Sequence, residues 1–323
     1  TSINNYNKLI ISTFSGYDDL FLKVGGGDFP GVIFYWDWGN KTSNLTWKYL
    51  PNNKYFVNTS VSKTEYNFDV DFAVQFLANP DYSETGDKES ADLTLNTHNI
   101  VEDYTINQNM KYIYSDNISF NIGWELKSLL LNYRRSFDDV EVAKLQSKPQ
   151  IFSSFFNAVW NPLPYIYINS GLRFAKYNRY DKLLTSPRLG LKLKVTSDLA
   201  FKLNWGTYYQ YLYTTNEEDE LLRIVDFWQP IPENKKPQEA NHLILGLEYW
   251  ISNGNTITLE TYYKTYSNIY DINPAPDYEN IYIGGENFVR SYYPNPIDNP
   301  IEIQNNLIYK NVVLNAVQFE IPL

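Results

Sequence analysis

Hydrophobic and polar residues alternate along much of this chain with a period of two. Between His242 and Tyr266, apolar side chains occupy every second position on both sides of a turn at 252–255. Successive side chains of a β-strand point to opposite faces of the sheet, so this pattern predicts a hairpin with one apolar face. Four further hairpins follow the same pattern, around turns at 51–54, at 115–117, in the segment WNPLPY and at 196–198.

The connections between these hairpins are long and polar. They comprise residues 72–100, 135–149 and 214–238. Short turns that alternate with long connections place all short turns at one end of the sheet and all long loops at the other. An up-and-down barrel requires this order, whereas the Greek-key crossovers of a β-sandwich usually interrupt it.

The two faces of the predicted strands differ in polarity. One face is rich in Leu, Ile, Val and Phe, and the other carries charged residues such as Lys192, Lys202 and Glu248. Charged groups on the inner face of a dry core would each cost several kcal/mol, roughly, and a watery interior removes that cost. The pattern therefore favours a transmembrane barrel whose apolar face contacts lipid.

Aromatic residues make up 17% of the chain, and many lie near the predicted strand ends. We expect two aromatic girdles, as in barrels that cross a membrane. The rings near the short turns are Trp47, Tyr49, Tyr55, Tyr112, Tyr114, Trp160, Tyr165, Tyr249 and Trp250. Those near the long loops are Tyr133, Tyr177, Tyr180, Tyr208, Tyr211, Tyr213, Tyr266 and Tyr270.

Composition and charge remove several other classes of protein. A formal charge of −10 argues against a nucleic-acid partner, which would require a basic surface. The absence of cysteine excludes a disulfide framework and thiolate chemistry. No apolar run is long enough for a membrane-spanning helix. The predicted fold is all-β, an antiparallel up-and-down transmembrane β-barrel.

Candidate catalytic and metal-binding residues are few. The only histidines are His98 and His242, and neither has a second histidine or cysteine at metal-ligand spacing. His242 also has no serine partner in a recognisable motif. We therefore expect no metal site, no cofactor and no enzymatic activity.

Two segments, SPRLGLKLKVTSDLAFKLNWGTYYQYLY and DFWQPIPENKKPQEANHLILGLEYW, resemble the barrel domain of TonB-dependent outer-membrane receptors. Earlier strands at 38–50, before Tyr66 and at 171–173 resemble that domain in the same order, and the similarity spans roughly residues 5–273. The abundance of Asn, Lys and Tyr resembles that of family members from Bacteroidota. The matching residues are Pro187, Arg188, Leu189, Gln210, Tyr211, Leu212, Trp228, Pro230, Pro232, Lys236, Pro237 and Gln238.

The resemblance implies a barrel of about 22 strands closed by an N-terminal plug. Such receptors, in the outer membrane of Gram-negative bacteria, import siderophores, cobalamin, metal chelates, glycans or peptides with energy from the TonB complex, which acts through the plug. The sequence accounts for about 11 or 12 strands and no plug. We expect half a barrel within 1–273. Within 274–323 we expect a loop and one final strand, which need not be continuous with the rest.

Ligand binding is expected at the end of the barrel that carries the long loops. Aromatic rings there could stack on a ligand, and amide groups could hydrogen-bond it. The alternative is that these rings belong to a girdle or pack the loops. The candidate residues are Tyr208, Gln210, Tyr213, Trp228 and Asn234.

Two other functions fit the composition. One is a passive outer-membrane pore or structural barrel, which would need no plug. The other is a soluble, aromatic-rich β-sandwich that binds carbohydrate at the cell surface. The second alternative requires two packed sheets in place of one continuous meander.

Overall fold

A computed structural model describes residues 2–26, 29–77, 90–215, 227–251, 255–272 and 307–320 of the chain. These residues form β-strands joined by turns. No helix among them is long and apolar enough to cross a membrane. The strands are β1 (Ser2–Asn4), β2 (Asn7–Gly26), β3 (Phe29–Tyr49), β4 (Tyr55–Leu77), β5 (Ser90–Ser115), β6 (Ile118–Phe137), β7 (Val140–Ser147), β8 (Gln150–Leu163), β9 (Ile166–Tyr177), β10 (Leu184–Lys194), β11 (Leu199–Gln210), β12 (Leu212–Thr215), β13 (Phe227–Pro230), β14 (Gln238–Trp250), β15 (Thr256–Ile272) and β16 (Leu307–Glu320).

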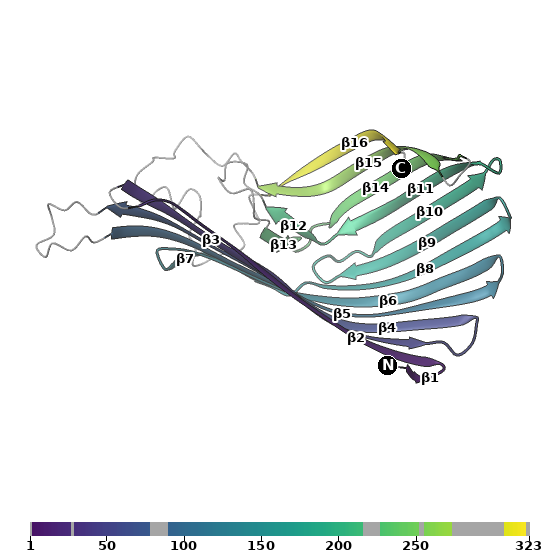
Figure 1. The fold of residues 1–323 in the computed structure, drawn as a ribbon, viewed down its shortest axis with the longest axis horizontal. Helices are drawn as coiled ribbons and strands as arrows, with labels where there is room; N and C mark the ends of the chain where they lie inside the picture. Colours follow the sequence, from purple (N-terminus) through teal and green to yellow (C-terminus); the bar gives the residue numbers. More distant parts are fainter. Residues whose placement is uncertain are drawn as a thin grey trace, which may run out of the picture.

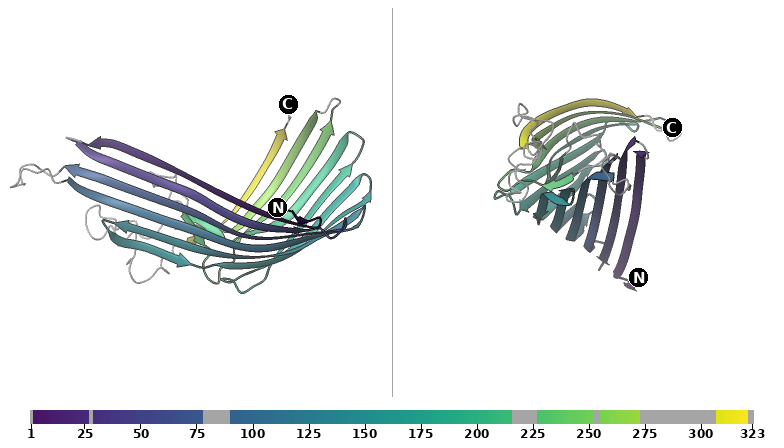
Figure 2. Two further views of the ribbon diagram at one scale, coloured as in Figure 1. Left: turned by 60° about the horizontal axis from the view of Figure 1, so that its bottom comes forward. Right: turned by 90° about the vertical axis from the view of Figure 1, so that its left-hand side faces the viewer.

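Fourteen strands form a single antiparallel sheet that follows the chain order. β7 pairs only with β6, at the margin of the meander, and β12 and β13 form a separate hairpin. All five predicted hairpins are present, with their short turns at the right-hand end of Figure 1. The prediction of an all-β, up-and-down sheet is confirmed. The described strands do not form the two packed sheets of a sandwich. The sheet curves into an arc (Figure 2), and the described strands do not close it into a ring.

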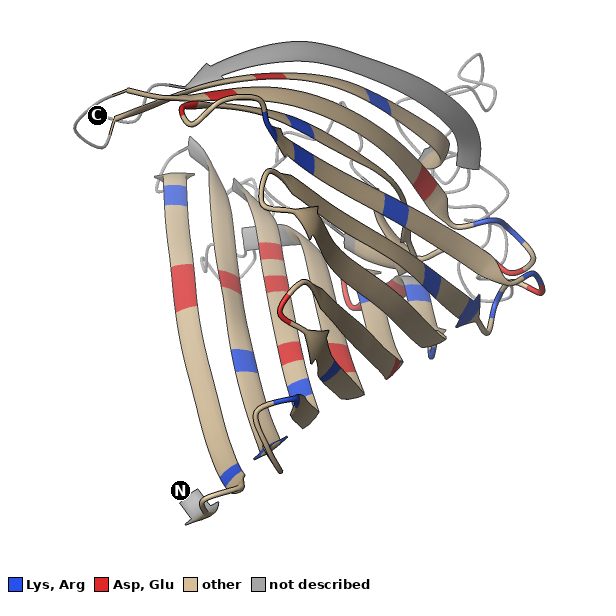
Figure 3. Ribbon diagram, turned by 90° about the vertical axis from the view of Figure 1, so that its right-hand side faces the viewer, with Lys and Arg blue, Asp and Glu red and all other residues tan. Residues whose placement is uncertain are grey.

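The strand pairing confirms the predicted separation of polar and apolar faces. Leu189 pairs with Trp205, then Leu243 and Tyr263 continue the same row across β14 and β15, with every side chain exposed. Charged residues occur along the strands as well as in the turns (Figure 3). They form rows of their own, such as the pair Lys192 and Lys202. Across β10, β11, β14 and β15 the apolar row thus lies on the convex side, and the charged residues lie on the concave side.

The N-terminal strands are longer than a membrane requires. β2 to β5 contain 20 to 26 residues each, whereas a tilted transmembrane strand needs about 9–11. Their free ends extend well beyond the rest of the sheet (Figure 1). On the convex side the apolar stretch gives way to a charged row in which the Lys63 ammonium lies 2.7 Å from Glu102 and 3.3 Å from Glu65. These ion pairs interrupt the apolar convex face at this level of the sheet.

Two of the predicted long loops are largely strand. Most of the segment 72–100 belongs to β4 and β5, and the segment 135–149 contains β7. The sheet also has more strands than the 11 or 12 expected, because β1, β2 and β7 were not predicted. Of the hairpin that β2 forms with β3, only the part of β3 from residue 38 onward was expected. Apolar residues occur on both faces of that hairpin beyond the membrane: Phe34, Trp36 and Trp38 pack on the concave side while Tyr35 faces outward. The sequence of this hairpin therefore does not show the alternation of apolar and polar residues that marks the other strands.

Several of the rings that were predicted to form a girdle beside the short turns are exposed. Trp47, Tyr55, Trp160 and Tyr165 all remain exposed, and Tyr55 stacks on Tyr112 with 4.7 Å between ring centroids. Aromatic rings prefer the boundary between hydrocarbon and water because they combine an apolar body with a polar edge. Exposed aromatic rings therefore gather at the end of the sheet that carries the short turns.

Gly123 tests how closely the inner wall is packed. A Cβ atom at this position would lie 2.6 Å from the Gln108 carbonyl oxygen and 2.6 Å from the Phe155 ring. Since the carbonyl belongs to the neighbouring backbone, Gly123→Ala should lower the thermal unfolding midpoint in detergent, at a cost of about 1–3 kcal/mol. Gly246→Ala is the matched control, because its nearest contact would be an ordinary 3.4 Å. Equal midpoints for the two variants would contradict this packing.

An aspartate row crosses the convex face of the extended strands. Asp19, Asp37 and Asp69 are paired in register, and Asp69 contacts His98. Burial raises the pKa of the Asp37 carboxyl group, and the negative charge of Asp69 raises it further. One carboxylate oxygen of Asp37 is buried without a hydrogen-bond partner among the described residues.

A carboxyl group with a raised pKa in the folded state destabilises the fold once pH exceeds that pKa. Asp37→Asn should therefore raise resistance to urea at pH 7, and the gain should shrink as pH falls toward 4 and the wild-type carboxyl group takes up its proton. Tryptophan fluorescence provides the measurement, since Trp36 and Trp38 adjoin this position. Asp18→Asn, on the opposite face of the same strand pair, is the control. A stabilisation that persists unchanged at pH 4 would show that charge is not the cause.

Candidate ligand-binding mouth

The connection between β11 and β14 folds back over the concave side of the sheet. The chain leaves β11 at Gln210 and forms the short hairpin of β12 and β13. This hairpin lies within the arc of the large sheet in both views of Figure 2. Pro232 and Pro237 then lead into β14 and cannot donate backbone hydrogen bonds to a sheet. The hairpin consequently narrows the end of the barrel at which the long connections lie.

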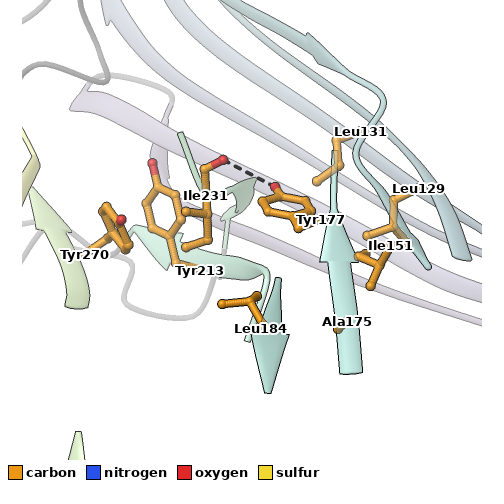
Figure 4. Packing of buried hydrophobic residues seen from close by; sticks show 9 residues of the cluster. All are labelled: Leu129, Leu131, Ile151, Ala175, Tyr177, Leu184, Tyr213, Ile231 and Tyr270. Atoms are coloured by element: carbon orange, nitrogen blue, oxygen red, sulfur yellow. Dashed lines mark hydrogen bonds between the residues drawn. The ribbon is translucent and has the colours of Figure 1, made fainter. Parts of the chain in front are cut away.

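A buried apolar cluster holds the hairpin against the inner wall. Tyr213 and Ile231 from the hairpin region pack with Tyr177 from the wall, and the exposed fraction of each side chain is 1% or less. Figure 4 shows these side chains pointing toward one another. The whole cluster comprises Leu129, Leu131, Ile151, Ala175, Tyr177, Leu184, Tyr213, Ile231 and Tyr270.

The prediction of a second aromatic girdle is wrong for these tyrosines. Tyr177, Tyr213 and Tyr270 are buried on the concave side, and Tyr211 packs against the same cluster. The sequence places them near the long loops correctly. Their inward direction depends on strand parity and on the fold of the hairpin, and neither can be read from the positions of the rings alone.

Polar contacts fix the segment that follows the hairpin. The Tyr177 hydroxyl group donates to the Ile231 carbonyl oxygen at 3.3 Å, and the Arg179 guanidinium donates to the same oxygen at 3.1 Å. Arg179 also donates to the Ser147 hydroxyl at 3.0 Å and lies 3.6 Å from the Glu233 carboxylate. One arginine thus joins the turn after β9, the end of β7 and the segment after β13.

The tyrosines of this region act as neutral groups. Burial raises the pKa of Tyr211 to about 12 and also raises the pKa of Tyr213. The Tyr213 hydroxyl donates to the Gln229 side-chain oxygen at 2.9 Å across the hairpin. These hydroxyl groups therefore serve as hydrogen-bond donors and not as bases at physiological pH.

The five predicted ligand-binding residues are divided between the wall and the hairpin. Tyr208 and Gln210 lie on the inner face at the end of β11, where both are exposed. Tyr213 is buried, Trp228 packs against the cluster, and Asn234 adopts a left-handed turn whose backbone N–H donates to the Arg179 carbonyl at 2.8 Å. Tyr208 and Gln210 are thus accessible, while the other three hold the hairpin. Ligand contact by these residues stays a prediction.

Below the hairpin the inner wall contains a polar hollow of about 550 Å³. Tyr208 borders it, together with Arg188, which the resemblance had marked only as a strand residue. Asparagines supply most of its remaining polar surface: Asn109, Asn121, Asn157, Asn169 and Asn204. Sequence reasoning did not mark these amides as ligand contacts, although each occupies an inward position of an alternating strand.

The described residues contain no cluster of three His, Cys, Asp or Glu side chains that could hold a metal ion. His98 lies on the convex face and His242 on the concave face, on strands far apart in the sheet order. Some charges of the inner wall are paired, as in the 2.9 Å contact between Arg173 and Glu125. The chemistry of this surface is therefore one of hydrogen bonding and charge recognition.

Known structures match the fold of the chain. The siderophore receptor PirA from Pseudomonas aeruginosa is similar with a TM-score of 0.50 and 11% sequence identity, covering 98% of this chain and 62% of the receptor. The RagAB peptide importer in its closed-closed state is similar with a TM-score of 0.55 and 11% identity, covering 87% of this chain and 41% of the importer chain. No protein-family model and no curated protein matches the sequence.

These similarities extend over only part of the compared proteins. The chain spans about three fifths of the length of PirA and two fifths of the RagAB chain. At this sequence identity they establish a shared fold, an antiparallel sheet of the type that forms outer-membrane receptor barrels.

The contacts of Arg179 predict that it anchors the hairpin segment. Arg179→Ala should increase hydrogen exchange of the backbone at 211–215 and 227–237 by about tenfold or more, because several hydrogen bonds are lost together. Lys182→Ala, at an exposed position of the same turn, is the control. Unchanged exchange in Arg179→Ala would show that the apolar cluster holds the segment without the arginine.

Proposed function

We propose that this chain forms part of the barrel wall of an outer-membrane receptor that binds a scarce ligand at its mouth and imports it. The observation that carries the proposal is a polar hollow on the inner wall beneath a hairpin folded into the barrel. A polar recess in the inner wall, near the segment that narrows the mouth, suits the capture of a ligand. The similar folds of PirA and RagAB support the receptor class.

The proposed location is the outer membrane of a Gram-negative bacterium. Exposed Leu, Phe and Trp rows on the convex side and exposed rings at the short turns support it. In hydrocarbon, the backbone N–H and C=O groups at the two edges of the sheet would lack hydrogen-bond partners. Each such group would cost roughly several kcal/mol. We therefore propose that further strands complete the barrel.

Energy for import is proposed to come from the TonB complex, acting through a plug domain. The ligand would be a siderophore, cobalamin, metal chelate, glycan or peptide. PirA is a siderophore receptor and RagAB a peptide importer, so the fold accommodates both kinds of cargo. We do not propose an enzymatic role.

A passive pore is the second candidate. The polar inner wall would suit it, since water-filled barrels carry such surfaces. The buried contacts between the hairpin and the wall favour the receptor, because a segment fixed on the inner wall at the mouth narrows the passage for free diffusion.

The genomic DNA on both sides of this coding segment provides the first test. We expect one continuous reading frame that encodes a plug domain upstream and additional amphipathic strands. Fractionation of the native host should then place the complete protein in the outer membrane. A frame that encodes further strands without any plug would favour the passive pore, and recovery in the soluble fraction would contradict both functions.

A further inference from the structure

A row of basic residues crosses the inner wall at one level of the barrel. The strand register aligns Arg188 of β10, Gly206 of β11, His242 of β14 and Lys264 of β15 as direct neighbours. All four positions face the concave side, opposite in parity to the exposed leucine row. We call Arg188, His242 and Lys264 the basic row.

Tyr208 and Gly206 shape this row. The Arg188 guanidinium lies 4.6 Å from the centroid of the Tyr208 ring, and the His242 ring lies 5.0 Å from it on another side. A Cβ at Gly206 would meet the Tyr208 hydroxyl at 3.1 Å and the Arg188 side chain at 3.2 Å, so glycine makes room for both. The stacking holds the guanidinium in a defined place without using its hydrogen-bond donors.

The charge of the basic row is not neutralised by described residues. Among the described residues, no carboxylate lies within salt-bridge distance of Arg188 or Lys264. The Lys264 ammonium lies 4.4 Å from the centroid of the Tyr262 ring. Other inner-wall cations do have partners, such as Lys192 with Glu248 at 3.4 Å. The hollow bordered by Arg188 is lined by asparagine amides and has no Asp or Glu among its lining residues.

We propose that the basic row and the adjoining hollow bind an oxyanion, a carboxylate or phosphate group carried by the imported ligand. Arginine presents paired donors that match these groups, and the surrounding amides add neutral donors. The attraction between the cations and a bound anion is stronger in a partly enclosed recess than in open water. This inference rests on the proposed receptor function and narrows its ligand to anionic compounds.

Binding of small anions to the complete protein in detergent tests the proposal. Citrate and inorganic phosphate, titrated separately by calorimetry at constant ionic strength, distinguish a carboxylate from a phosphate preference. We expect at least one of them to bind, and Arg188→Gln and Lys264→Gln each to weaken it by about tenfold or more. Arg188→Lys should restore only part of the affinity, because it keeps the charge and loses the planar fork.

Lys192→Gln is the matched control, a cation on the same strand and face that is already paired. It should leave anion affinity unchanged. The proposal is overturned if neither anion binds, or if Arg188→Gln and wild type bind equally. If no anion binds and Arg188→Gln also lowers the thermal unfolding midpoint, the result would indicate that Arg188 pairs with a carboxylate of the protein itself. A failure of uptake by living cells, with anion binding intact, would instead contradict the receptor function.

Discussion

Backbone hydrogen bonding between neighbouring strands is the interaction on which the other features of this protein depend. Each strand of a sheet must satisfy its backbone N–H and C=O groups by pairing with the strands beside it. This requirement fixes the antiparallel meander and, through it, the register of every row of side chains. The apolar rows, the charged rows and the basic row all follow from that register.

Beyond the membrane the same ladder serves a different purpose. The extended ends of β2 to β5 carry aromatic side chains on the concave face, where Trp36 and Trp38 lie 4.3 Å apart between centroids and Phe68 is buried. Their convex face carries the aspartate row. A pair of surfaces this different, on a single sheet, shows how the alternation of side chains separates two environments without a second layer of structure.

The mouth depends on tertiary contacts instead of the ladder. The hairpin of β12 and β13 is too short to be stable alone, since isolated two-stranded hairpins are marginal in water. Its position is set by the buried cluster around Tyr177 and by the hydrogen bonds of Arg179. The inner wall thus provides both the surface that binds the hairpin and the hollow beneath it.

The sequence by itself determined the strand hairpins, their order, and which face of each membrane strand is apolar. These properties follow from local alternation and short turns, which need no knowledge of distant residues. Tertiary structure alone decided that Tyr177, Tyr213 and Tyr270 point inward, and that Arg188, His242 and Lys264 share one row. Arg188 and Lys264 lie 76 positions apart by their numbers, and only the register of four strands brings them to the same level.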